Sequence, residues 1–115
     1  MKDDAGKLPR GARLDTPAQF TGYFSRRYQG HWYQVLARPN GRPQPARLGL
    51  IVGRKVAARA VDRSLARRLA REAFRRKRSP LAGLDVVIRL VARVANTERR
   101  AASHELQELL ARLGS

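Results

Sequence analysis

LGLIVGRKVAARAVDRSLARRLAREAFR, residues 48–75, combines the two patterns that decide the fold of this 115-residue chain. It opens with a short apolar run that ends in a basic pair, which is typical of a buried strand. From residue 57 to residue 77, apolar residues recur at helical spacing, with Val61, Leu65 and Leu69 on one side, which predicts an amphipathic helix with a core side. A strand that leads directly into a long helix indicates an α+β domain in which helices cover a sheet.

Shorter patterns on either side predict the remaining elements. Segments with strand-like composition are residues 31–38, 47–54 and 84–94. A first helix is expected to begin at Thr16, which can cap it, and to end before Gly30. A last helix is expected to begin at Asn96 or Thr97, with four leucines on one face. We expect a single domain, residues 15–115, that follows a flexible arm, residues 1–14.

Composition indicates a partner that carries negative charge. The chain has 25 Lys and Arg against 9 Asp and Glu, which gives a formal net charge of +16 and a pI near 11.8. Such an imbalance is typical of proteins that bind nucleic acid. No apolar stretch approaches the 18 or so residues that a membrane span needs, and the N-terminus has no apolar leader pattern. We therefore expect a cytoplasmic location and no membrane partner.

The residues that usually carry enzyme chemistry form no recognisable constellation. Cysteine is absent, which excludes a disulfide framework, a thiolate metal site and a cysteine nucleophile. His31 and His104 lie far apart and lack metal-ligand spacing. We expect no catalytic residue, no metal site and no cofactor in the protein itself.

The predicted long helix carries most of the positive charge. Residues 54–78 contain eleven basic and two acidic residues. Five arginines are spaced by four residues and would form a slowly spiralling ridge about 24 Å long; they are Arg59, Arg63, Arg67, Arg71 and Arg75. Asp62 and Glu72 are too few to neutralise them, so the pattern favours a polyanion over an ordinary solvated helix face.

Three motifs in this region resemble the signature of the bacterial ribonuclease P protein component. They are LGLIVGRKV at residues 48–56, AVDR at residues 60–63 and RRLAREAFR at residues 67–75. Arg13-Leu14 and the pair Phe20 and Phe24 are similar to the start of the family pattern. The resemblance covers nearly the whole chain. It implies an α/β sandwich of order αβββαβα, with a left-handed βαβ crossover that general chirality rules would not predict.

The resemblance also implies partners and site residues. The basic helix would dock on the catalytic RNA subunit of ribonuclease P, and the implied RNA-binding residues are Arg54, Lys55, Arg59, Arg63, Ser64, Arg67, Arg68, Arg71 and Arg75. The sheet and first helix would line a cleft for the 5′ leader of precursor tRNA, with Phe20, Phe24 and Tyr33 as the candidate leader-cleft residues. Endonucleolytic removal of the leader would be carried by the RNA subunit, with divalent metal such as Mg²⁺ bound to that RNA.

Two positions depart from the family pattern, and one side-chain assignment is open. The family's Arg-Asn-Arg tripeptide reads Arg63-Ser64-Leu65 here. Ser64 can still donate a hydrogen bond, whereas Leu65 cannot contact phosphate and is expected to join the core. A one-residue slip in the strand would turn Trp32 inward in place of Tyr33.

Composition alone leaves other binding proteins open. A structural or ribosomal RNA-binding protein without a catalytic role is the main alternative, and only the motifs of residues 54–75 argue against it. A duplex DNA reader is disfavoured because the basic helix lacks the Asn and Gln used for base readout. A membrane-surface helix is disfavoured because the apolar stripe lacks aromatic residues for the interface.

Overall fold

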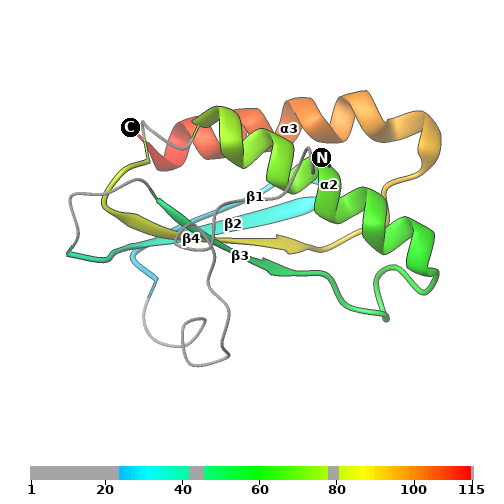
Figure 1. Ribbon diagram of the computed structural model, residues 1–115. Coiled ribbons are helices and arrows are strands. Elements are labelled where there is room, and N and C mark those ends of the chain that lie inside the picture. The colour runs from blue at the N-terminus through cyan, green and yellow to red at the C-terminus, as the bar shows by residue number, and fades with distance from the viewer. Residues whose placement is uncertain (1–23, 42–45, 78–80, 115) are drawn as a thin grey trace, which may run out of the picture.

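A four-stranded sheet forms one layer of the computed structural model, which describes residues 24–41, 46–77 and 81–114 (Figure 1). The strands and helices are β1 Arg26–Gln29, β2 Tyr33–Pro39, β3 Arg47–Ile51, α2 Ala60–Lys77, β4 Leu84–Leu90, the 3₁₀ turn η2 Asn96–Glu98 and α3 Arg99–Leu113. The expected arm at residues 1–14, the helix start at Thr16 and the candidate residue Phe20 lie outside the described residues.

The sheet is mixed, in the spatial order β1-β2-β4-β3. β2 pairs antiparallel with β1 and with β4, while β3 and β4 run parallel. Parallel neighbours need a crossover connection, and α2 supplies it between β3 and β4. The predicted α+β class is confirmed, and the described elements follow the order βββαβα. The left-handed sense of the crossover remains a prediction.

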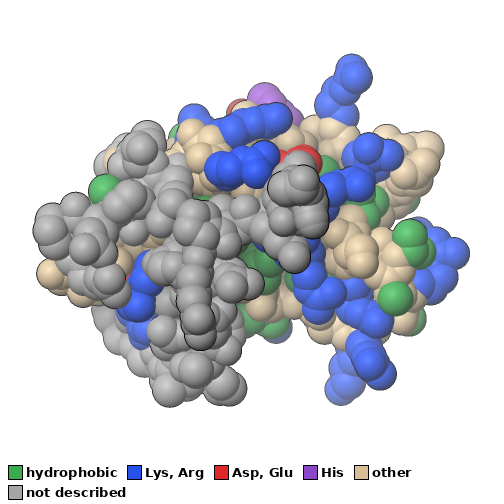
Figure 2. All heavy atoms as spheres, in the orientation of Figure 1, with side chains coloured by type: hydrophobic (Ala, Val, Ile, Leu, Met, Phe, Trp, Pro, Cys, Tyr) green, Lys and Arg blue, Asp and Glu red, His purple; other side chains and the backbone are tan. Residues whose placement is uncertain are grey.

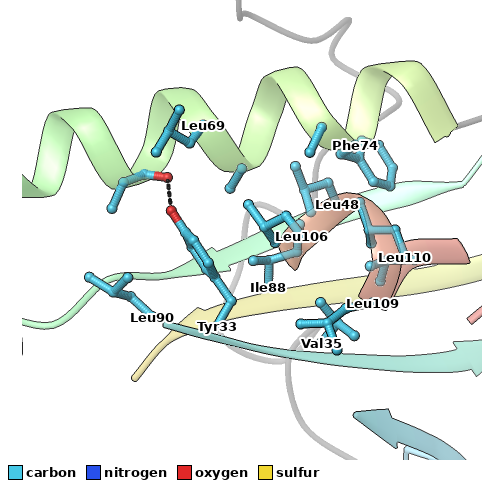
Figure 3. Packing of buried hydrophobic residues seen from close by; sticks show 14 of the residues in the cluster. Tyr33, Val35, Leu48, Leu69, Phe74, Ile88, Leu90, Leu106, Leu109 and Leu110 are labelled. Atoms are coloured by element: carbon cyan, nitrogen blue, oxygen red, sulfur yellow. Dashed lines mark hydrogen bonds between the residues drawn. The ribbon is translucent and has the colours of Figure 1, made fainter. Parts of the chain in front are cut away.

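Both long helices lie on one face of the sheet and pack against each other (Figure 1). Alternate residues of each strand point toward them, as Tyr33 and Val35 of β2 and Ile88 of β4 do (Figure 3). Leu106 and Leu110 of α3 complete this core and are fully buried. Each such side chain stabilises the fold by about 1.5–3 kcal/mol through loss of apolar surface from water.

The buried side of α2 differs from the predicted stripe. Leu69 is buried, but Val61 is 64% exposed, so its predicted place in the core was wrong. The inward positions of the first turns are Asp62 and Ala66. Because successive helical residues are rotated by about 100°, Val61 points well away from the side that Asp62 occupies. The alanines of α2 let the helix lie close to the core beneath it.

Strand β1 was missed, because the first helix was expected to continue to Gly30. Instead the chain turns between β1 and β2, where the Gly30 N–H donates to the Tyr33 carbonyl at 2.8 Å. The carboxylate of Glu105, on α3, accepts backbone hydrogen bonds from His31, Trp32 and Tyr33 at 2.6, 2.9 and 3.0 Å. A carboxylate more than 70 residues away therefore holds this turn, and no local sequence pattern predicts this contact.

The last strand is shorter than predicted and the last helix begins close to its predicted start. β4 ends at Leu90, and the 3₁₀ turn at Asn96 leads into α3 at Arg99. The Glu98 side chain accepts the backbone N–H of Ala95 at 2.8 Å, which fixes this entry. None of the helices in the described residues combines the length and apolar character needed to cross a bilayer.

Candidate nucleic-acid interface

Cationic side chains gather over α2 and the chain that leads into it (Figure 2). The exposed members of the predicted RNA-binding set are Arg54, Lys55, Arg59, Ser64, Arg68 and Arg75. The half-buried members are Arg63, Arg67 and Arg71. Arg54 and Lys55 stand in the turn between β3 and α2. The structure therefore places all nine residues on one helix and its approach, with every one at least partly accessible.

Two of these arginines already have partners within the chain. The Arg59 guanidinium donates to both carboxylate oxygens of Asp62, at 3.1 and 3.3 Å, although its side chain is 71% exposed. The Arg63 guanidinium donates to the carbonyls of Ala57 and Ala58, at 3.0 and 2.7 Å. Arg63 thus anchors the loop that leads into α2, which gives it a structural role besides any contact with an anion.

Asp62 connects α2 with the chain that follows β4. Its carboxylate also lies 3.8 Å from the Arg93 guanidinium. The hydrogen bond from Arg59 lowers the pKa of Asp62, with the charges of Arg59 and Arg93 acting in the same direction and burial opposing them. One carboxylate therefore serves two arginines, and the local balance stays positive.

Arg71 of α2 lies in surroundings that disfavour its positive charge. Its Nε atom is buried and has no hydrogen-bond partner within the described residues. Burial and the neighbouring charge of Arg67 lower the pKa of Arg71, against the smaller opposing effect of Glu72. A negatively charged ligand would relieve both effects, since it would offer an acceptor and a compensating charge.

The opposite face of the sheet carries an aromatic residue and a second set of arginines. Phe24 packs there with Val87 and Leu36, and 8% of Phe24 is exposed. The Arg38 guanidinium carbon lies 4.9 Å from the centroid of the Phe24 ring, which is cation–π geometry. An aromatic ring beside a cation is the combination that binds single-stranded nucleic acid.

Asp85 organises the arginines of this face. It is 3% exposed and accepts two hydrogen bonds from Arg47, at 2.9 and 3.0 Å, and one from Asn40 at 3.2 Å. Arg38 lies 3.6 Å away. Burial alone would raise the pKa of Asp85, but these hydrogen bonds and charges outweigh it and lower the pKa. In the described part of the chain, no group of three or more His, Asp or Glu side chains could hold a metal ion.

Tyr33 does not belong to this face, so its prediction as a leader-cleft residue was wrong. It is fully buried on the helix side of the sheet, and its hydroxyl donates to the Ala66 carbonyl of α2 at 2.9 Å (Figure 3). Burial, with the charge of Glu105, raises its pKa. The cause is strand parity: β2 begins at Tyr33 and points its odd-numbered residues at the helices. Trp32 lies in the preceding turn and is half-buried against the same core.

Three arginines near the two surfaces were not predicted. Arg38 follows the apolar residues of β2, Arg93 follows β4, and Arg99 opens α3. Arg38 and Arg93 are single cations near the end of a predicted strand, and Arg99 stands beside Arg100 near the start of a predicted helix. The one sequence signal for Arg93 is that it interrupts an apolar run, which is what a residue leaving the sheet for the surface does.

Comparison with known proteins assigns the chain to a family. The sequence model of the family described as Ribonuclease P matches residues 8–114, nearly the full length. The chain belongs to the ribonuclease P protein family. That assignment confirms the resemblance found in the arginine-rich segment.

Individual relatives in the ribonuclease P protein family agree. The chain is 41% identical to the ribonuclease P protein component of Chromobacterium violaceum over 111 residues, which is 95% of this chain and 91% of the relative. It is 46% identical to that of Burkholderia pseudomallei over 88 residues, a match that covers 75% of this chain and 63% of that longer relative. The solved ribonuclease P protein of Staphylococcus aureus has the same fold, with a TM-score of 0.63 at 20% identity over 89% of this chain and 91% of that one.

Proposed function

We propose that this chain is the protein subunit of bacterial ribonuclease P and supports endonucleolytic removal of the 5′ leader from precursor tRNA. It would bind the catalytic RNA subunit through α2 and the leader through the opposite face of the sheet. The observation that carries the proposal is the arginine surface of α2, in a chain that belongs to this family. A cytoplasmic location follows from that role.

The α2 surface suits a folded RNA. Arginines bind phosphate oxygens in a bidentate manner, and their charges release counterions from the RNA on binding. Arg67, Arg68 and Arg75 are all accessible for this purpose. The arginines of α2 repel one another. A bound phosphate backbone would remove this repulsion, which favours binding of a polyanion.

The Phe24 face suits a single strand. Stacking on an aromatic ring contributes about 1–3 kcal/mol per base and tolerates any sequence. Arg38 would hold the backbone beside Phe24, while Arg89 of β4, exposed on the same face as Val87, adds charge. A leader of variable sequence requires this kind of recognition.

Hydrolysis would belong to the RNA subunit and its bound divalent metal, which activates a water and stabilises the leaving oxygen. The protein would bring two polyanions together, and its role is therefore to screen the repulsion between the RNA subunit and the substrate.

Reconstitution tests the proposal. The full chain is added to a bacterial ribonuclease P RNA at low magnesium, with a precursor tRNA that carries a 5′-labelled leader. We expect the protein to increase the rate of leader release at least tenfold. If the RNA alone is active at high magnesium but the protein does not stimulate it at low magnesium, the chain is an RNA-binding protein of another kind, such as a ribosomal one.

A further inference from the structure

A groove runs between α2 and the chain from the end of β4 into α3. It comprises a cavity of about 530 Å³ lined by the N-terminal half of α2 and one of about 530 Å³ along α3, and both are lined by Asn96 and Arg99. The first cavity has five arginines and one carboxylate in its wall: Arg59, Arg68, Arg71, Arg93, Arg99 and Asp62. We call the two cavities together the α2–α3 groove.

Two of these arginines lie outside α2 and the chain that leads into it. Arg93 lies after β4 and Arg99 is the first residue of α3, and both are exposed. They line the first cavity together with Arg68 and Arg71. We propose that the α2–α3 groove binds phosphate groups of the ribonuclease P RNA, with Arg93 and Arg99 as RNA-binding residues beyond α2. This inference rests on the proposed function.

The contacts of Asp62 indicate that the arginines of the groove are preorganised. Asp62 is 9% exposed, and its carboxylate accepts two hydrogen bonds from Arg59 and forms an ion pair with Arg93 at 3.8 Å. Such a shared carboxylate orients two guanidinium groups toward one place and lowers the entropy lost when they bind a third group. It cannot neutralise both, so positive charge remains at the mouth of the groove.

Arg71 gives a second, independent sign of an anionic ligand. It lines the same cavity, and its buried Nε has no acceptor within the described residues. Buried N–H groups without an acceptor are rare and costly. A phosphate in the groove would supply compensating charge for Arg71 and would accept hydrogen bonds from the guanidinium groups around it.

The geometry favours the RNA subunit over the tRNA leader. The groove lies on the helix side of the sheet, whereas Phe24 lies on the opposite side with Val87. One single-stranded leader of a few nucleotides cannot occupy both faces, while a large folded RNA can cover the whole helix side.

A comparison with an arginine outside the groove tests the inference. The full-length wild type, the Arg93→Ala/Arg99→Ala double variant and Arg112→Ala are titrated with a bacterial ribonuclease P RNA at several salt concentrations. Arg112 is exposed at the other end of α3 and serves as control. We expect the double variant to bind about tenfold more weakly, with the slope of log affinity against log salt reduced by about 1.5, since each phosphate contact contributes roughly 0.7–0.9. Arg112→Ala should change the slope little.

A rescue variant tests the place of the contact. Leu65 lines the same cavity, so Leu65→Arg adds a guanidinium group to the groove from α2. In the Arg93→Ala background, Leu65→Arg should recover most of the lost affinity for the RNA subunit and none of any change in affinity for precursor tRNA alone.

Three outcomes separate this inference from the proposed function. If the wild type neither binds the RNA nor stimulates cleavage, the proposed function fails. If the wild type does both and the double variant behaves like Arg112→Ala, the groove is overturned while the function stands. If the double variant loses affinity for precursor tRNA and keeps its affinity for the RNA subunit, the assignment of the groove to the RNA subunit is overturned.

Discussion

Glu105 of α3 lies directly against Gly30 of the β1–β2 turn. A β-carbon added at Gly30 would clash with the Glu105 carboxyl group. This contact exists because the Glu105 carboxylate points at the turn and accepts hydrogen bonds from the backbone N–H groups of His31 and Trp32. The absence of a side chain at position 30 is therefore what lets α3 hold the hairpin.

The first prediction is that Gly30 and Glu105 are energetically coupled. Glu105→Ala should destabilise the protein by about 1–3 kcal/mol, because the turn loses its acceptor. Gly30→Ala should cost about 1–3 kcal/mol through overpacking. In the double variant the clash disappears, so the total should be smaller than the sum by at least about 0.5 kcal/mol. Urea unfolding of all four proteins measures the coupling, and strict additivity would contradict it.

The second prediction concerns Tyr33, whose hydroxyl joins β2 to α2. Tyr33→Phe removes the hydrogen bond to Ala66 and keeps the ring in the core. We expect a loss of about 0.5–1.5 kcal/mol of unfolding free energy. Affinity for precursor tRNA should be unchanged, because the residue is fully buried on the helix side. A selective loss of precursor binding, with stability intact, would return Tyr33 to the leader cleft.

The third prediction concerns Phe24. Phe24→Ala should weaken binding of precursor tRNA to the reconstituted enzyme more than binding of mature tRNA, because only the precursor has a leader to stack. A loss near tenfold corresponds to the lower part of the range for one stacked base. Phe24→Leu preserves an apolar packing partner for Val87 and separates stacking from stability. Equal losses for both RNAs would count against a leader site.

The fourth prediction separates two arginines of α2. Arg75 is exposed in the last turn, whereas Arg63 donates to the Ala57 and Ala58 carbonyls. Arg75→Ala should reduce the salt slope of RNA binding by about 0.7–0.9 and change stability by less than about 0.5 kcal/mol. Arg63→Ala should destabilise the fold by about 1 kcal/mol. Thermal unfolding beside RNA titration distinguishes the two roles, and identical behaviour of the two variants would refute the distinction.

The fifth prediction is an acid-sensitive contribution to stability from Asp85. Its folded-state pKa is lowered, so the carboxylate stabilises the fold at pH values above its unfolded pKa of about 3.9. This contribution is lost as pH falls through the lower folded-state pKa. At pH 7, Asp85→Asn should therefore be less stable than the wild type by about 1–3 kcal/mol. The difference should shrink below about pH 4, and unfolding curves from pH 7 to pH 2.5 would show a constant difference if the idea is wrong.

The sequence predicted the structure best where the spacing of the apolar residues and the spacing of the charged residues indicate the same element. The pattern of residues 57–77 predicted both a helix, which the structure shows at Ala60–Lys77, and its cationic surface, because periodicity within one helix needs no knowledge of distant residues. Strand parity at Tyr33 depends on pairing with β1 and on Glu105, which lies 72 residues away, so a local pattern could not fix it. The sequence could not predict the α2–α3 groove either, because Arg93 and Arg68 line one cavity only once β3 and β4 have paired in parallel.

Both borders of the sheet are short strands that carry arginine. β1 has four residues and includes the exposed Arg27, and β3 has five and begins at Arg47. Short charged borders hinder one sheet from extending onto another. Separate copies of this chain therefore repel each other edge to edge, and the repulsion fades as ionic strength rises. Added salt would therefore weaken RNA binding and at the same time favour self-association of the chain.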